Sequence, residues 1–167
     1  MDLQRVGPDD VPALAAFLRT VDLTVSGLDA PTVRLWVLRG ADNEVIGSTG
    51  YEIGDDRRHV LIRSVAVDPS GRAAGLGTEL ARFAFDRATA EGAKHAWLFS
   101  RRSGPFWQRL GFEPADRQAL GRVLADTQQV QLFHRTGQFE REVAWSHALT
   151  AATPSVRDST TGTTPQR

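Results

Sequence analysis

The stretch VAVDPSGRAAGLGTEL, from Val65 to Leu80, joins a short apolar segment to a polar turn and then to the start of an amphipathic pattern. Arg72, Gly75 and Gly77 lie at this junction, among residues with small side chains. The first turn of a helix presents unpaired backbone N–H groups and the positive end of the helix dipole. Because glycine has no Cβ atom, an anion can approach the backbone closely, and Arg72 adds a positive charge. The stretch therefore predicts a cradle for a phosphate or pyrophosphate group.

The helix that follows the cradle has the clearest pattern in the chain. Leu76, Leu80, Ala84 and Ala88 form one apolar stripe at helical spacing, which predicts a helix over residues 75–91. Two known nucleotide-binding motifs match the stretch from Val65 to Leu80 only poorly. No lysine follows the glycines as in a Walker loop, and no third glycine completes a dinucleotide-binding fingerprint.

Strands and shorter helices are expected around this helix. Two stretches rich in β-branched and aromatic residues, separated by turn residues, predict a hairpin, and a third stretch extends it to an antiparallel meander. The expected strands cover residues 3–6, 32–40, 44–53, 59–67, 95–100 and 139–149, with another beginning at Phe112. The other expected helices cover residues 9–20, a short segment from Pro105 and residues 117–126.

The composition excludes several classes of protein. The 167 residues, 41% hydrophobic and 24% charged, fit one globular domain. Basic and acidic residues balance at 20 each, which argues against nucleic acid or a membrane surface as partner. No apolar run approaches the ~18 residues of a membrane span, and the N-terminus lacks a signal-peptide core, so we expect a cytoplasmic location. The chain has no cysteine and only four scattered histidines, so we expect neither a thiol nucleophile nor a metal site.

The stretch and its surroundings resemble the GNAT superfamily of acetyl-CoA-dependent N-acetyltransferases. The family signature places Arg or Gln three residues before Gly-x-Gly or Gly-x-Ala, and Arg72 to Gly77 match it after VAVDP. FWQRLGF, residues 106–112, is similar to the family's FYEKLGF segment, and the similarity covers residues 2–115. It implies an α+β fold, an α/β/α sandwich around a central mixed, mostly antiparallel sheet whose fourth and fifth strands splay apart. We expect this domain to cover residues 1–149, followed by a disordered, Thr-, Ser- and Pro-rich tail over residues 150–167.

The resemblance implies acetyl-CoA as the cosubstrate, with its pantetheine arm between two splayed strands, here residues 63–67 and 97–100. Backbone groups of Val65 and Val67 are implied to pair with the pantetheine amides. The N–H near Val65 is implied to polarise the thioester carbonyl, which makes Val65 a catalytic candidate. The residues implied to bind the cosubstrate are Val65, Ala66, Val67, Arg72, Ala73, Ala74, Gly75, Leu76, Gly77, Thr78, Ser100 and Phe106.

Without a cysteine, the expected reaction is direct attack by a neutral substrate amine in a ternary complex. Glu52 is the first candidate for the base that takes the amine proton, directly or through water, and Glu113 is the alternative. The tyrosine that often protonates the leaving thiolate in this family is replaced by Trp107, whose indole cannot act as an acid. A free thiol has a pKa of about 8.5, so the CoA thiolate is a tolerable leaving group without that acid.

Arg63 and Ser64 are unusual in an otherwise apolar strand. Successive side chains of a strand face opposite ways, so only one of the two is expected to meet the substrate. Arg63 can clamp a substrate carboxylate or another oxyanion, or it can lie on an exposed face of the strand. Tyr51 and Arg101 complete the candidate substrate-binding residues.

Two further alternatives stay open at this point. Glu52 can pair with Arg63 or Arg58 across the hairpin instead of acting as a base. A pocket closed by residues 20–31 and carrying Arg63 would favour a small anionic substrate, whereas an open acidic groove would favour a peptide.

The predicted function is N-acetylation of a primary amine on a small molecule. Acetylation of protein N-termini or lysines, and acyl-CoA sensing without turnover, are the alternatives. LIRSVAV, residues 61–67, and residues 116–129 are similar to a GNAT branch found with arsenic-resistance operons, some of whose members acetylate arsinothricin or phosphinothricin-like glutamate analogues. Gly121 and Val130 replace a proline and a phenylalanine of that branch. GNAT relatives are often dimers, and the C-terminal strand with Trp145 is a candidate for exchange or pairing across such an interface.

Overall fold

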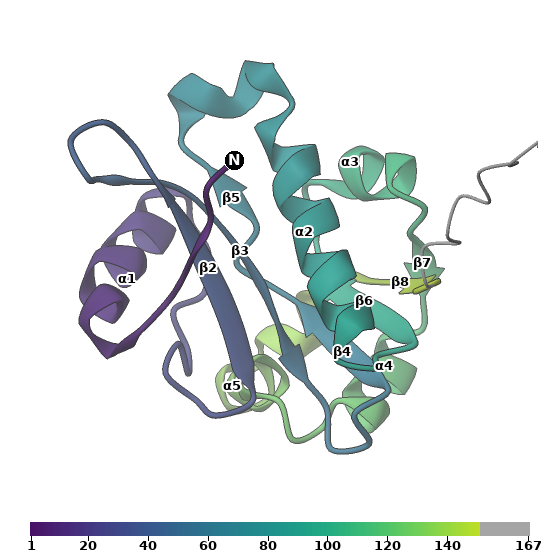
Figure 1. The fold of residues 1–167 in the computed structure, drawn as a ribbon. Coiled ribbons are helices and arrows are strands. Elements are labelled where there is room, and N and C mark those ends of the chain that lie inside the picture. The colour runs from purple at the N-terminus through teal and green to yellow at the C-terminus, as the bar shows by residue number, and fades with distance from the viewer. Residues whose placement is uncertain (151–167) are drawn as a thin grey trace, which may run out of the picture.

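The computed structural model describes residues 1–150 as a central sheet with helices on both sides (Figure 1). The strands are β1 (Gln4–Arg5), β2 (Val33–Arg39), β3 (Val45–Ile53), β4 (His59–Ile62), β5 (Ala66–Val67), β6 (His95–Phe99), β7 (Glu113–Ala115) and β8 (Ala144–Ala148). The α-helices are α1 (Val11–Thr20), α2 (Leu76–Ala90), α3 (Gly104–Arg109), α4 (Arg117–Val123) and α5 (Gln128–Thr136). Turns of 3-10 helix cover Pro8–Asp10, Pro69–Ala74 and Gln138–Arg141. Apart from Thr150, the tail predicted to be disordered lies outside the described residues.

The sheet has the strand order β1-β2-β3-β4-β6-β8-β7, and β5 pairs with β3 off this path. β4 and β6 run parallel, while the other described pairs are antiparallel. A parallel pair needs a long crossover connection, and α2 lies in the segment that links β4 and β5 to β6. The predicted α+β fold with a mixed, mostly antiparallel sheet is therefore confirmed.

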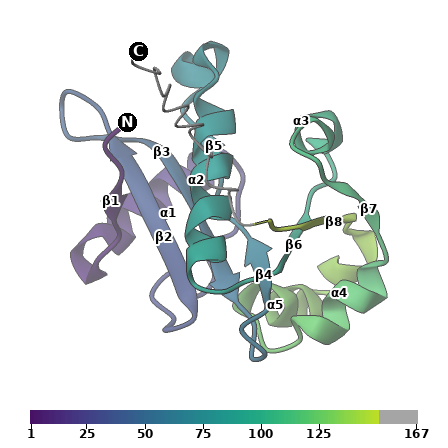
Figure 2. The same ribbon diagram turned by 45° about the vertical axis from the view of Figure 1, so that its right-hand side comes forward.

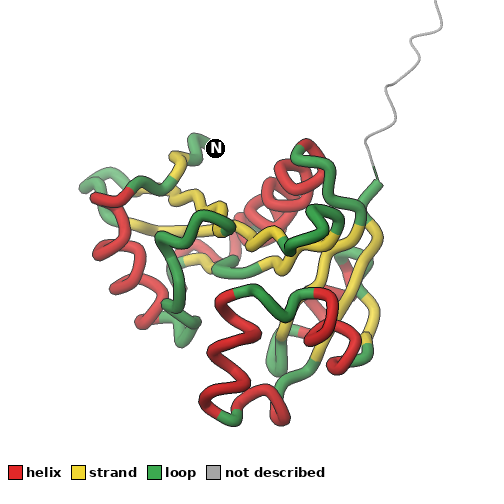
Figure 3. The backbone as a smooth tube through the Cα atoms, turned by 90° about the horizontal axis from the view of Figure 1, so that it is seen from below, coloured by secondary structure: helices red, strands yellow, loops and turns green. Residues whose placement is uncertain are grey.

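The two faces of the sheet are covered by different helices (Figures 2 and 3). On one face, Tyr51 and Ile62 share a buried cluster with Ala84 of α2. On the other face, Leu35 lies in a cluster with residues of α1, and Leu61 lies in a cluster with residues of α4 and α5. Neighbouring strand positions therefore point to opposite helical layers, as the alternation of a strand requires.

The strand predicted over residues 59–67 is interrupted in the structure and forms two shorter strands, β4 and β5. β4 ends at Ile62, which pairs with Tyr51, and β5 resumes at Ala66, which pairs with Ser48. Between these two pairs, the segment from Ile62 to Ala66 contains one residue more than the facing segment of β3. Such an extra residue is a β-bulge. Ser64 within the bulge has φ of 59°, an uncommon value for a residue other than glycine. Ser48 Oγ donates a 2.6 Å hydrogen bond to the Ser64 carbonyl and fixes this conformation.

Several other predicted elements differ from the structure near the C-terminus. The helix expected over residues 117–126 ends at Val123, and the strand expected from residue 139 begins at Ala144, because a 3-10 turn precedes it. α5 corresponds to no predicted element. Its boundaries nevertheless have ordinary signals, with Thr127 at its N-terminal cap and Gly137, with φ of 73°, at its end.

The C-terminal strand is not an edge of the sheet. β8 pairs with β6 on one side, and its residues 144–146 pair with β7 on the other. The expectation that this strand pairs edge to edge across a dimer interface is therefore wrong for Trp145 and its neighbours, whereas exchange of the strand between two chains stays a prediction. Trp145 of β8 is 9% exposed, and its indole N–H donates a 2.9 Å hydrogen bond to the Ser100 carbonyl. Within residues 1–150, none of the helices combines the length and the apolar character needed to cross a membrane.

Truncation of Leu61 tests the packing of the parallel β4–β6 pair. Leu61 is fully buried and pairs with Trp97. We expect Leu61→Ala to lower the free energy of unfolding by roughly 2–5 kcal/mol, because lost burial and a residual cavity add together. Val143→Ala is the control, since Val143 is 42% exposed, and should change stability by less than about 0.5 kcal/mol. Equal effects of the two variants in urea unfolding would contradict this packing.

Candidate active site

The bulge opens the sheet between β5 and β6. β4 pairs with β6 as far as Leu61 and Trp97. Beyond that point Ala66 and Val67 pair with β3, while residues 98–99 of β6 pair with β8. The facing backbone edges of β5 and β6 therefore have no ladder partner within residues 1–150. This is the splayed arrangement predicted for the fourth and fifth strands.

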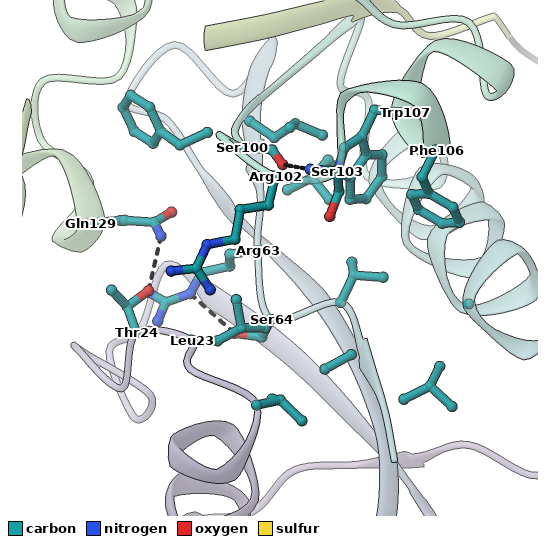
Figure 4. Close-up of a pocket in the computed structure, with 18 of the residues that line it drawn as sticks. Leu23, Thr24, Arg63, Ser64, Ser100, Arg102, Ser103, Phe106, Trp107 and Gln129 are labelled. Carbon is teal, nitrogen blue, oxygen red and sulfur yellow. Dashed lines mark hydrogen bonds between the residues drawn. The ribbon is translucent and has the colours of Figure 1, made fainter. Parts of the chain in front are cut away.

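A pocket of about 550 Å³ occupies this opening (Figure 4). Its walls come from the bulge and β5, from the start of α2, from the segment joining β6 to α3, from the loop after α1 and from α5. The lining residues are Val21, Leu23, Thr24, Ile62, Arg63, Ser64, Val65, Ala66, Val67, Arg72, Gly77, Leu98, Phe99, Ser100, Arg102, Ser103, Phe106, Trp107 and Gln129.

Nine of the residues singled out in the sequence line this one pocket: Arg63, Ser64, Val65, Ala66, Val67, Arg72, Gly77, Ser100 and Phe106. Three lining residues that the sequence analysis did not single out lie on the side of α1 and α5. Leu23 and Thr24 come from the loop after α1, and Gln129 comes from α5.

The cradle at the start of α2 has the backbone conformation that the glycines suggest. Gly75, with φ of 73°, turns the chain from the 3-10 segment that contains Ala73 and Ala74 into α2. A Cβ atom at Gly77 would lie 3.7 Å from Phe106, on the side of the pocket. Arg72 Nε donates a 3.3 Å hydrogen bond to the Val67 carbonyl, which holds this cation beside β5. Leu76 and Thr78 belong to the first turn of α2 without lining the pocket.

Arg63 belongs to the bulge and is one of the residues that line the pocket, and its side chain is buried in the pocket wall (Figure 4). Its Nε lies 3.4 Å from Ser64 Oγ, and its Nη1 lies 4.0 Å from Glu52 Oε1. Neither Nη1 nor Nη2 has a hydrogen-bond partner among the described residues. Burial lowers the pKa of Arg63 to about 10, although the nearby Glu52 carboxylate opposes this shift. A buried guanidinium with two unpaired nitrogens is suited to bind an oxyanion.

Glu52 does not reach the pocket. Its side chain is 1% exposed, and both oxygens are engaged. Oε1 accepts a 2.8 Å hydrogen bond from the Gln128 backbone N–H, and Oε2 accepts one of 2.8 Å from Thr32 Oγ1. Burial raises the pKa of Glu52, while the hydrogen bonds and Arg63 oppose the rise. Glu52, the residue expected to take the proton of the amine, therefore lies behind Arg63 and does not line the pocket.

Two other candidates lie away from the pocket. Tyr51 points to the α2 face of the sheet and donates a hydrogen bond to Glu91, and burial raises its pKa. Glu113, the alternative base, is exposed on β7. Trp107, which stands where the family's tyrosine is expected, does line the pocket and is 7% exposed.

Arg101 lies in an adjoining cavity of about 220 Å³ instead of the main pocket. Its Nε forms a 3.4 Å ion pair with Glu142, which also accepts a 2.7 Å hydrogen bond from Gln138. Arg102, the next residue, lines both cavities and pairs with the exposed Asp22 at 3.3 Å.

The charged side chains that line the main pocket are all basic. They are Arg63, Arg72 and Arg102, and no carboxylate lines it within the described part of the chain. The remaining polar side chains in the lining are neutral: Thr24, Ser64, Ser100, Ser103 and Gln129. The pocket therefore favours an anionic ligand. Among residues 1–150, no three side chains of metal-ligating type come together.

Comparison with known proteins identifies the family. The model of the acetyltransferase (GNAT) family matches residues 9–112. The chain belongs to the GNAT acetyltransferase family. The prediction made from the motif is confirmed, and the chain carries the domain of an acyl-CoA-dependent N-acetyltransferase. No curated protein matches the chain.

Solved GNAT structures share the fold at low sequence identity. An N-acetylglutamate synthase from Neisseria gonorrhoeae, complexed with coenzyme A and N-acetyl-glutamate, matches 90% of this chain with a TM-score of 0.65 and 15% identity. This chain spans only 36% of that synthase. A GNAT acetyltransferase from Staphylococcus aureus Mu50 matches with a TM-score of 0.69 and 12% identity over 89% of this chain and 99% of its own. An aminoglycoside 6'-N-acetyltransferase complexed with coenzyme A matches with a TM-score of 0.65 and 10% identity over 92% of this chain and 99% of its own.

The residues present fit a coenzyme A thioester. The unpaired edges of β5 and β6 can pair with the amides of an extended pantetheine arm. The turn before α2, with Arg72 and Gly77, can hold the pyrophosphate. Together these features bring the cosubstrate-binding part of the pocket next to Arg63.

A negative charge at the start of α2 should abolish acetyl-CoA binding. We expect Gly77→Glu to place a carboxylate in the space next to Phe106 and to repel the pyrophosphate. Calorimetry should show at least a hundredfold weaker binding, about 2.7 kcal/mol or more. Ala90→Glu, on an exposed position at the other end of α2, is the matched control and should bind normally. Normal binding by Gly77→Glu would show that the pyrophosphate lies elsewhere.

The raised pKa of Glu52 predicts a pH-dependent contribution to stability. The folded protein binds this proton more tightly than the unfolded chain, whose value is near 4.5. The stabilisation is fully present below the unfolded pKa and is lost as the pH rises through the folded pKa. The free energy of unfolding of the wild type, relative to Glu52→Gln, should therefore fall as the pH is raised from about 4. Glu113→Gln, at an exposed position, should show no such difference. A relative stability that grows with pH would mean that attraction to Arg63 outweighs burial.

Proposed function

We propose that this protein transfers an acetyl group from acetyl-CoA to the primary amine of a small molecule that carries an anionic group. The observation that carries the proposal is the buried guanidinium of Arg63, which lines the pocket and has two nitrogens without a hydrogen-bond partner in the described chain. A shift of this guanidinium out of the pocket wall would let an oxyanion of the substrate supply those partners in a bidentate arrangement. Val65, two residues further along, is where the thioester carbonyl is expected.

The shape and charge of the pocket support a small acceptor over a peptide. The loop after α1 contributes Val21, Leu23 and Thr24 to the wall opposite α3, so the pocket is closed by residues from the segment 20–31. The three arginines and the lack of a lining carboxylate among residues 1–150 disfavour a lysine side chain or a protein N-terminus. Protein acetylation would call for an open, acidic groove.

The proposed reaction is direct attack of the amine on the thioester carbonyl in a ternary complex. The amine must be neutral to attack, and its proton passes to water, because Glu52 is shielded by Arg63, Thr32 and Gln128. The backbone N–H of Val65 would stabilise the developing oxyanion. The thiolate then leaves without an acid from Trp107, which agrees with a thiol pKa of about 8.5.

The most direct test of the proposed reaction measures the release of free thiol from acetyl-CoA in the presence of a panel of amines. The panel contains amino acids, aminophosphonates, phosphinothricin and arsinothricin, with aminoglycosides, spermidine and N-terminal peptides as cationic or uncharged counterparts. Turnover confined to phosphinothricin and arsinothricin would favour the arsenic-resistance branch that residues 61–67 resemble. Tight acetyl-CoA binding without turnover of any amine would favour a sensor.

Substitution of Arg63 tests the anion clamp. We expect Arg63→Gln to raise the KM for an anionic amine by about 10–100-fold, since a charged hydrogen bond is lost, while the KM for acetyl-CoA changes little. Arg63→Lys retains a charge opposite Glu52 and separates loss of the bidentate contact from loss of folding. Arg58→Gln, on an exposed position of the same hairpin, is the control and should leave both values unchanged. An unchanged acceptor KM in both Arg63 variants would remove Arg63 from the acceptor site.

A further inference from the structure

α5 contributes to the pocket but lies outside the residues that the family model matches. The GNAT family model ends at residue 112, whereas α5 covers Gln128–Thr136 and places Gln129 in the lining. The residues expected to hold the cosubstrate all lie before residue 112. This helix is therefore a part of the site that the family signature does not describe.

Three contacts hold the start of α5 against the pocket. The Gln128 backbone N–H donates to Glu52 Oε1 at 2.8 Å, and Glu52 faces Arg63. Gln129 Nε2 donates a 2.9 Å hydrogen bond to Thr24 Oγ1 of the loop after α1. Gly27 of the same loop, with φ of 63°, approaches so closely that a Cβ atom there would collide with the Gln128 side chain. Gln129 and Arg63 are thus positioned by one connected set of contacts.

The carboxamide of Gln129 has one end engaged and one end free for a ligand. Its nitrogen points to Thr24, and its oxygen lies on the other side (Figure 4). A carbonyl oxygen accepts hydrogen bonds, and an amine that enters the pocket has N–H groups to donate. No carboxylate is present in the described lining of the main pocket, so neutral oxygens are the acceptors there, and they stabilise the protonated amine less than a carboxylate would.

We propose that Gln129 is a specificity-determining residue whose carboxamide oxygen binds the acceptor amine while Arg63 binds the acceptor's oxyanion. The inference rests on the proposed function and names its substrate class: compact molecules that carry an amine and an oxoacid group together, as amino acids and aminophosphonates do. Thr24 orients the carboxamide, and α5 fixes its distance from Arg63.

The experiment measures binding of matched ligand pairs to the full chain saturated with CoA, by calorimetry. Each pair consists of an anionic amine and the same anion without the amine: glutamate with glutarate, and 2-aminoethylphosphonate with ethylphosphonate. Gln129→Leu should weaken binding of the amine by about tenfold and leave its partner within twofold, because one hydrogen bond is lost. Arg63→Lys should weaken both members of a pair. Gln131→Leu, on the exposed side of the same helix, should weaken neither.

A second variant distinguishes contact with the amine from a structural role. Gln129→Glu keeps the shape of the side chain but adds a carboxylate, which would hold the amine in its protonated form. The charged groups near this position include Arg63, Arg72 and Arg102 in the lining, with Glu52 behind Arg63 and Asp22 paired to Arg102. Gln129 also lines the adjoining cavity, where Arg101 and Glu142 form an ion pair. We expect kcat to fall by about tenfold or more at neutral pH and the acid limb of kcat to shift to higher pH, because the ammonium ion is not a nucleophile. A merely structural residue would not move that limb.

The failure of this inference is distinguishable from failure of the proposed function. If Arg63→Lys weakens both members of each pair and Gln129→Leu weakens neither, or weakens both equally, then Arg63 is the clamp and Gln129 does not bind the amine. If none of the four ligands binds the CoA-loaded protein, the anionic substrate class is wrong and this inference is wrong with it.

Discussion

The β-bulge between Ile62 and Ala66 is the constraint on which the site depends. One extra residue in this strand turns β5 away from β6, after β4 has begun a parallel pairing with that strand. A regular continuation of β4 would have extended this pairing and filled the opening with backbone hydrogen bonds. The bulge instead leaves two unpaired edges within residues 1–150 and places Arg63 in the wall of the pocket between them. In the proposed function, the same irregularity provides both the groove for the cosubstrate and a contact for the acceptor.

Burying Arg63 has an energetic cost that the rest of the domain must offset. A charge removed from water is strongly penalised unless it is paired and hydrogen-bonded, and here one carboxylate at 4.0 Å is the nearby opposite charge. Glu52 is itself held by Thr32 and Gln128, so it cannot turn to cover the guanidinium completely. The arrangement sacrifices stability for a cation that is fixed and poorly solvated before any ligand arrives. Such preorganisation strengthens the binding of an anion, because little reordering is needed.

The residues proposed to bind the cosubstrate could be singled out from the sequence, and those proposed to bind the acceptor only in part. Arg72, Gly75 and Gly77 lie within six residues of one another, and their local pattern carries its own physical explanation. Arg63 could be found because a charge interrupts an apolar strand. The contact between Thr24 and Gln129 joins residues 105 positions apart, and no local pattern encodes it. Pairing of Glu52 with Arg63 was one of two alternatives from the sequence, and the structure places the two side chains 4.0 Å apart. The sequence could not decide between them, because the position of Glu52 also depends on its contact with α5, a helix that was not predicted.

The strand order also has a consequence for the way the chain acquires its structure. β8 lies inside the sheet, between β6 and β7, yet it is the last strand in sequence among residues 1–150. Until residue 148 has left the ribosome, β6 and β7 each expose an unpaired edge, and exposed edges of this kind can pair with other chains. α5, which forms part of the pocket wall, emerges in the same late interval. A nascent chain can thus assemble the meander and α2 early, but the pocket proposed to bind the acceptor is incomplete until this late segment is in place.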